Sequence, residues 1–283
     1  MILADVFLSV IGVLTLLIAS ITDIKSKEVP DWLSFATIAA ALGIRLIHSI
    51  AYADYSYFIY GIIGFGIMFF LGLILYYGRL WGGGDTKLLM GLGALFGTAP
   101  FFVTVNYPFI AILLINIIIV GSIYSLLFAI KMFIKNYRIT IMEIKHQMER
   151  MKFARWCYLG GSLVSLLAFF LFQDRFLKVI SISLAGFSIF YIQLLIFIRA
   201  VEKVGMFKII PIAKLTEGDW VAEDIHFKGK LYYSKKSLGI ENKQIEYLKK
   251  HGVKRILIKE GVPFVPSFLI GLIITLVYGS VIV

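Results

Sequence analysis

The sequence predicts an all-α polytopic membrane protein with about eight transmembrane helices and a small cytoplasmic α/β insertion before the last helix. The first reason is composition: 60% of the 283 residues are hydrophobic and only 16% are charged, far from the balance of a soluble globular domain. The second reason is the length of the apolar stretches, because a helix needs roughly 20 residues to cross a hydrocarbon core about 30 Å thick. The third is a mostly polar segment near the end of the chain, residues 201–261.

The predicted spans are residues 2–21, 32–50, 57–77, 87–105, 109–133, 156–172, 177–198 and 264–283. The first span carries Asp5 and has no Lys or Arg before Lys25, which is the wrong start for a cleavable signal peptide. Glycines interrupt the fourth span, so we expect that helix to be short, tilted or partly re-entrant, with close helix packing as the alternative explanation.

The distribution of basic residues predicts the orientation. Seven Lys and Arg lie in residues 131–155 and fourteen in residues 199–259, whereas the loops near 51–56 and 97–108 have none. Since loops rich in Lys and Arg stay in the cytoplasm, both termini are predicted outside. The formal charge of +11 is therefore explained by the orientation of the chain and its contact with the lipid bilayer, and it does not indicate nucleic-acid binding.

The chain is predicted to contain three parts: a transmembrane core over residues 1–200 with a basic cytoplasmic loop at 134–155, a small α/β module at 201–262, and the last helix at 263–283. Within the module, β-branched or alternating runs predict strands at 208–215, 231–234 and 255–259. Residues 241–251 carry Ile245 and Leu248 on one helical face, and Gly252 is placed to end that helix.

Two aspartates, Asp23 and Asp85, lie where apolar stretches meet water. A carboxylate at that depth is costly unless it is paired or used, so each is a candidate functional residue. Asp23 has an alternative explanation as the partner of Lys25 or Lys27, and Asp85 has one as a helix N-cap. Together they predict an acid/base pair on the cytoplasmic side.

The residues around the aspartates suggest the substrate. Gly82, Gly83 and Gly84 would let an extended peptide backbone approach Asp85 without a side chain in the way, and Lys87 and Glu28 are further candidates for substrate binding. Asp31, which precedes a span, is instead expected to be an N-cap. Two close carboxylates share a proton, so one can activate water while the other donates to a peptide carbonyl.

Other chemistries find little support in the sequence. Cys157 is the single cysteine, and the four histidines have no partners at metal-ligand spacing, so neither a disulfide nor a metal site is expected. A Gly-x-Ser-x-Gly elbow is absent, and the glycine loop lacks the spacing of a phosphate loop. We expect no cofactor.

The chain resembles the prepilin and preflagellin (prearchaellin) peptidases of the archaeal type, membrane aspartyl proteases with a Gly-x-Gly-Asp motif. Gly82-Gly83-Gly84-Asp85-Thr86-Lys87-Leu88 matches the second aspartate motif, and Thr22-Asp23-Ile24-Lys25 with the following basic loop and Pro30 matches the first. The resemblance implies a hydrolase with catalytic Asp23 and Asp85 that processes signal peptides. Its substrates would be archaellin or type IV pilin precursors, cut between a short basic leader and the apolar segment.

The C-terminal part, residues 208–271 with Pro263-Phe264-Val265-Pro266, also looks like the end of archaeal-type members. One departure from the family is informative. Larger bacterial members carry a Cys-x-x-Cys domain between the first two helices and N-methylate the product, but this chain has neither those cysteines nor room for that domain. Peptidase activity without N-methyltransferase activity is therefore expected.

Two other functions stay open at the sequence level. In an ion- or proton-coupled transporter the two acids would carry protons or cations, although such sites usually lie near the bilayer midplane. In a non-catalytic membrane assembly factor, the 201–262 module would bind a partner and the aspartates would only cap or pair. The oligomeric state is left open.

Overall fold

A computed structural model of the chain describes residues 2–227, 230–235 and 237–279, and most of them are helical. Within these ranges six helices are long and apolar enough to cross a membrane: α1 (Ile2–Ser26), α2 (Asp31–Tyr52), α3 (Ser56–Tyr77), α5 (Phe109–Lys135), α7 (Lys152–Leu171) and α8 (Arg175–Gly205). The protein is thus a mostly helical, multi-pass membrane protein, as the composition predicted.

The other two predicted spans are shorter helices. α4 (Gly83–Leu95) has 13 residues and α10 (Val265–Tyr278) has 14, which at 1.5 Å per residue is about 20 Å each. The predicted continuation of α4 to residue 105 is wrong, because Phe96 leaves the helical conformation at φ −118° and Gly97 and Pro100 follow it. Residues 280–283 of the last predicted span lie outside the described part of the chain.

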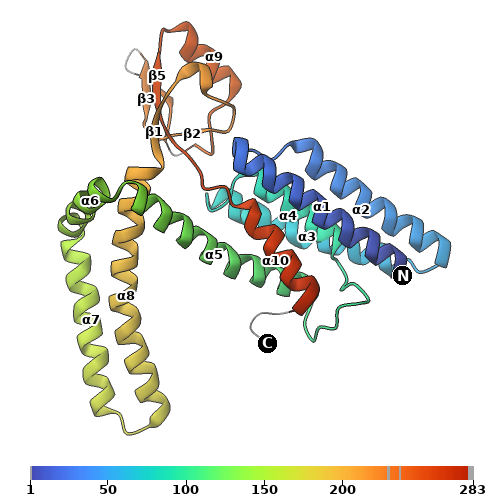
Figure 1. Cartoon of the computed structure of the whole chain (residues 1–283), viewed down its shortest axis with the longest axis horizontal. Helices are drawn as coiled ribbons and strands as arrows, with labels where there is room; N and C mark the ends of the chain where they lie inside the picture. Colours follow the sequence, from blue (N-terminus) through green and yellow to red (C-terminus); the bar gives the residue numbers. More distant parts are fainter. Residues whose placement is uncertain (1, 228–229, 236, 280–283) are drawn as a thin grey trace. The chain divides into compact units, whose positions relative to one another are not determined.

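The chain divides into two compact units, Met1–Leu126 with Gly261–Val283, and Leu127–Glu260. We call the first the bundle unit and the second the basic unit. In the bundle unit α4 packs against both α2 and α3, and α10 packs against α1 (Figure 1). The two segments of the bundle unit are far apart in sequence, so the last helix completes a core that the first helices begin.

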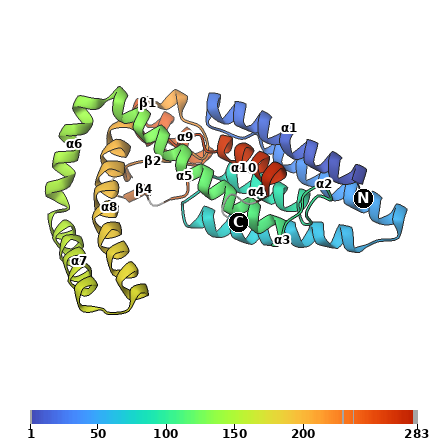
Figure 2. The ribbon, with the colours of Figure 1, turned by 60° about the horizontal axis from the view of Figure 1, so that its bottom comes forward.

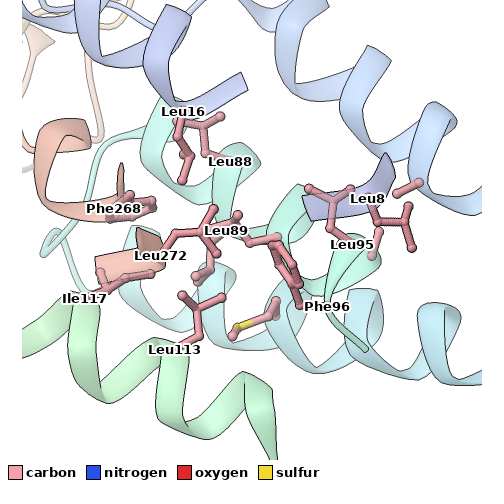
Figure 3. Close-up of a cluster of buried hydrophobic side chains, with 14 of the residues drawn as sticks. Leu8, Leu16, Leu88, Leu89, Leu95, Phe96, Leu113, Ile117, Phe268 and Leu272 are labelled. Carbon is pink, nitrogen blue, oxygen red and sulfur yellow. The ribbon is translucent and has the colours of Figure 1, made fainter. Parts of the chain in front are cut away.

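Leucines of α4 form the middle of the bundle core. Leu88 meets Leu16 of α1, and Leu89 lies near Leu272 of α10 (Figure 3). The fully buried members of this cluster drawn there also include Leu95, Phe96, Leu113, Ile117 and Phe268. Because α4 is buried on nearly all sides, its position is fixed by packing rather than by its own short length.

Glycines allow α3 and α4 to approach at backbone distance. A Cβ added at Gly93 would lie 2.4 Å from the Gly64 oxygen, and one at Gly97 would lie 2.0 Å from the Tyr60 oxygen. Neither contact leaves room for a side chain. The glycines of the fourth predicted span therefore serve close helix packing.

The end of α4 farther from Asp85 is held by a buried arginine. Arg45 of α2 is only 1% exposed, and its guanidinium donates to the carbonyl oxygens of Ala94 and Leu95 over 3.0 and 2.8 Å, and to that of Tyr57 over 2.9 Å. The Tyr57 hydroxyl in turn donates to Asp5 over 2.6 Å. These bonds satisfy carbonyls that a helix C-terminus otherwise leaves unpaired.

The basic unit begins within α5 and continues with α6 (Tyr137–Arg150), α7 and α8. α7 and α8 lie side by side as a hairpin (Figure 2), and α6 also packs against α8. Most residues of α7 are exposed, several are half-buried, and Ser162 is the one buried residue of this helix. Such an apolar, exposed surface is what lipid would cover.

The rest of the basic unit is a small α/β module. Its elements are β1 (Phe207–Pro211), the 3-10 helix η1 (Ile212–Lys214), β2 (Trp220–Val221), β3 (Ile225–Phe227), β4 (Lys230–Tyr233), α9 (Asn242–Lys250) and β5 (Arg255–Lys259). β5 lies between β1 and β2 in an antiparallel sheet, and β3 pairs with β4.

The predicted secondary structure of this module is largely confirmed. β5 has the predicted bounds, and Ile245 and Leu248 are buried on one face of α9. Gly252 has φ +77°, the conformation that ends a helix and favours glycine. The strand predicted at 208–215 stops at Pro211, because the chain turns there into η1.

Candidate active site

Asp23 lies in the last turn of α1, and only 6% of its surface is exposed. Its Oδ2 accepts a hydrogen bond of 2.9 Å from the backbone N–H of Val265, the first residue of α10. The negative end of the α1 dipole disfavours a charge at this position. The amide of Val265 supplies a compensating interaction, which local sequence did not reveal.

Asp85 lies in the first turn of α4, but it is not the N-cap. Gly82 occupies the cap position and α4 begins at Gly83, so Asp85 is the third helical residue. Its Oδ2 accepts from the Gly82 N–H over 3.2 Å. The carboxylate therefore supports the helix start from inside the first turn, as the acid of a capping box does.

The structure brings the two aspartates to one region of the bundle unit. Asp23 bonds to the amide of Val265 and Asp85 to that of Gly82, and the residues directly before these amides, Phe264 and Trp81, are in ring contact. Two carboxylates held near each other in a site with little water cannot both ionise cheaply, which is the condition for sharing a proton.

The glycine loop packs against the segment that follows Asp23. A Cβ added at Gly84 would lie 3.0 Å from Cβ of Val29, whereas additions at Gly82 and Gly83 would meet atoms only at 3.5 and 3.8 Å. A side chain at Gly84 would therefore crowd Val29, whereas a Cβ at Gly82 or Gly83 would make only ordinary van der Waals contacts.

Lys87 and Asp31 form an ion pair at 2.5 Å between α4 and α2. Asp31 is the first residue of α2 and its side chain makes no cap bond, so the predicted N-cap role is wrong. The ion pair is in contact with solvent, because 33% of the Lys87 side chain and 62% of the Asp31 side chain are exposed. Glu28, in the loop between the helices, is exposed.

Three aromatic side chains, Trp81, Phe264 and Phe268, form a cluster next to the two aspartates, which we call the aromatic trio. The ring centroid of Trp81 lies 5.7 Å from the ring centroid of Phe264 and 5.0 Å from that of Phe268. Trp81 directly precedes Gly82, and Phe264 directly precedes Val265. The trio therefore joins the two chain segments whose amides bond to the aspartates. The sequence signalled this only through Pro263-Phe264-Val265-Pro266.

No group of three or more His, Cys, Asp or Glu that is suited to a metal ion exists among the described residues. His48, the histidine nearest the bundle core, stacks on Tyr52 and Tyr57 with ring centroids 4.6 Å apart.

These features define a multi-pass helical membrane protein in which two aspartates from different helices bond to the amides of two segments that contact each other. Residues 10–133 match the model of the "Type IV leader peptidase family", so both aspartates and the glycine loop fall within the match. This part of the chain is therefore similar to that family, in agreement with the resemblance inferred from the two aspartate motifs.

The chain is also similar to curated archaeal proteins. It is 34% identical to a preflagellin peptidase of Methanocaldococcus jannaschii over 133 residues, and this aligned region makes up 45% of this chain and 56% of the relative. It is 41% identical over 86 residues to a preflagellin peptidase of Methanococcus maripaludis, covering 30% and 37%. The chain thus spans about half the length of these relatives or less.

Proposed function

We propose that the protein is a membrane-embedded aspartic endopeptidase that removes the short basic leader from archaellin or type IV pilin-like precursors at the cytoplasmic face. The observation that carries the proposal is that Asp23 and Asp85, 62 positions apart in the sequence, bond to the amides of two segments that meet through Phe264 and Trp81. The family match over residues 10–133 supports the same reaction class.

The mechanism follows from the shared proton. The ionised aspartate takes a proton from water as the water attacks the scissile carbonyl, while the protonated aspartate donates to the carbonyl oxygen. Gly82 and Gly83 carry no side chain that would keep an extended substrate backbone away from Asp85. Gly84 has a packing role, and Lys87 is held by Asp31, so these two are weaker candidates for substrate contact than Gly82 and Gly83.

Glu28 stays a candidate for substrate binding because its position is exposed and near Asp23 in the chain. A basic leader would be attracted to an acid there. The proposed reaction needs neither a metal nor a cofactor, and N-methylation of the product is not part of the proposal.

The proposed topology has eight crossings, with α4 and α10 completing the six longer helices. Both termini would lie outside, and the basic loop at 134–155 and the 201–262 module would lie in the cytoplasm with the two aspartates. The division into a core (1–200), the module and a last helix (263–283) belongs to this proposal. The oligomeric state is not part of it.

The test is cleavage of preflagellin from M. jannaschii, and of archaellin and pilin precursors from the source organism, after co-expression with the full-length protein. Wild type is expected to shorten at least one precursor. Asp23→Asn and Asp85→Asn should each lower the rate by at least about a hundredfold, the size of a lost acid or base. Asp31→Asn, an acid outside the pair, serves as the matched control.

Unchanged cleavage by either aspartate variant would contradict the paired mechanism. Failure of wild type with every precursor would contradict the peptidase function. The transporter alternative gains no support from the family match or the relatives. A non-catalytic assembly factor would be indicated if both variants left filament formation unchanged.

We further propose that the α/β module shapes access to the aspartates. Phe207 pairs with Lys259, and the Glu260 N–H donates to the Met206 carbonyl over 2.8 Å. The two ends of the module therefore meet, and a short glycine-serine linker can replace residues 208–259 without stretching the chain. Unimpaired cleavage by this deletion variant, in a folded protein, would refute the access role.

A further inference from the structure

The start of α10 reaches the candidate pair although it lies outside the region that matches the family model. Val265 donates its backbone N–H to Asp23 Oδ2 in a buried bond of 2.9 Å between residues 242 positions apart. A backbone N–H can only donate, so it is satisfied by a carboxylate oxygen. The contact therefore favours the ionised form of Asp23.

The direction of α10 strengthens this preference. Val265 is its first helical residue and Pro266 follows, so the positive end of a 14-residue helix meets Asp23. Asp23 itself lies in the last turn of α1, whose carbonyl end repels a negative charge. The start of α10 offsets that repulsion at the same carboxylate.

Asp85 is held differently. Its helix start also favours a charge, but its Gly82 donor lies 3.2 Å away, longer than the 2.9 Å bond at Asp23. The shorter amide bond stabilises a charge on Asp23 more than the longer one does on Asp85, so Asp85 is the better holder of a shared proton.

Packing fixes the donor in place. A Cβ added at Gly121 of α5 would lie 2.3 Å from Cζ of Phe264, so the absent side chain at Gly121 makes room for that ring. The Ser267 hydroxyl donates to the Phe264 carbonyl over 2.6 Å, and Trp81 covers the ring from the glycine loop. The two amide donors, Gly82 and Val265, are therefore coupled through aromatic neighbours.

We propose that Phe264 and Val265 are positioning residues of the catalytic site, which hold Asp23 as the ionised base and leave the shared proton on Asp85. The inference deepens the proposed function and rests on it. The other titratable groups whose charges act at Asp23 or feel it are Lys27 at the end of α1, Asp85 on α4 and Tyr124 on α5. None of these is changed by the variants below.

The test removes the donor N–H at position 265 and compares the result with a variant that keeps it. Val265→Pro lacks the N–H, and the first turn of a helix tolerates proline; Val265→Ala keeps the N–H and is the matched control. The ionisation of carboxyl groups is followed by infrared spectroscopy in the purified full-length protein. The pH–rate profile of precursor cleavage is measured in parallel.

In Val265→Pro the pH at which the first carboxyl of the pair ionises should rise by about one unit. The acid limb of the pH–rate profile should move with it, whereas Val265→Ala should match wild type in both. A merely structural role would lower the rate at every pH without moving the limb. Equal midpoints in the Pro and Ala variants would overturn the inference.

Should Val265→Pro fail to fold, a backbone ester at position 265 removes the same N–H and keeps the valine side chain. An unmoved midpoint in the folded ester variant would also overturn the inference. Failure of the proposed function has a different signature, namely full cleavage by Asp23→Asn or Asp85→Asn. The infrared titration does not depend on cleavage, so it tests the role of Val265 whether or not the protein cleaves the precursor.

Discussion

At the scale of single residues, the shared proton predicts a limit of activity at both ends of the pH range. The proposed mechanism needs one ionised and one protonated carboxyl. Cleavage measured as kcat/KM should therefore fall at acid pH, where both aspartates are protonated, and at alkaline pH, where both are ionised, by roughly tenfold per unit well beyond each limit.

The control for this pH dependence is a pH series of protein unfolding, which should show the protein folded over the same range. Asp31→Asn should keep the wild-type profile, because Asp31 pairs with Lys87 at the surface of the protein. A profile without a fall at either end of the range in which the protein stays folded would contradict a proton shared by the two aspartates.

The Lys87–Asp31 ion pair gives a second prediction at this scale. Both side chains are part-exposed, so the pair should contribute no more than about 1 kcal/mol to the free energy of unfolding. Lys87→Met, Asp31→Asn and the double variant form a cycle, measured by thermal unfolding in detergent. Measuring the KM of precursor cleavage for the same three variants shows whether Lys87 binds substrate or only pairs with Asp31.

If Lys87 serves the ion pair alone, KM should be unchanged in Lys87→Met. A higher KM in Lys87→Met but not in Asp31→Asn would instead assign Lys87 to the substrate, as the sequence suggested.

At the scale of elements, the position of α4 depends on a contact that its own sequence does not contain. Arg45 satisfies the carbonyls of Ala94 and Leu95 at the end of α4 away from Asp85. Arg45→Met would leave these buried carbonyls without their donor, so we expect a loss of about 3 kcal/mol in the free energy of unfolding. Thermal or denaturant unfolding in detergent measures this loss.

Arg45→Lys is the matched control for that variant. Lysine keeps the charge but lacks the planar fork that reaches several carbonyls, so its loss should be smaller than that of Arg45→Met. Equal stability of Arg45→Met and wild type would show that the guanidinium bonds do not hold α4.

The helices and strands were predicted most accurately where the sequence pattern is local. Residues 255–259 and the buried face of α9 followed directly from β-branched runs and helical spacing. The prediction for α4 ran too far, because residues 96–105 are apolar but contain the turn-forming Gly97 and Pro100. Hydropathy measures how apolar a segment is, and it does not detect the residues at which a helix ends.

At the scale of the whole molecule, the proposed topology predicts which residues an impermeant reagent can reach. Cys157 is the single cysteine and is exposed, so Cys157→Ala gives a background without cysteines. In that background, Ser56→Cys at the start of α3 should react with an impermeant maleimide in intact cells. Lys243→Cys in α9 should react only after the membrane is permeabilised.

Reaction of Lys243→Cys in intact cells would reverse the predicted orientation. Cleavage assays on both cysteine variants show whether each one is still correctly inserted, which is the control for this labelling.

The sequence by itself determined the membrane class, the two aspartate motifs and the family resemblance, because composition and short motifs are properties of neighbouring residues. Tertiary structure decided which groups meet: the Val265 amide with Asp23, Arg45 with the end of α4, and Lys87 with Asp31 rather than with solvent alone. These contacts join residues 49 to 242 positions apart. No local pattern encodes them, since they arise only when helices pack and buried polar groups must find partners.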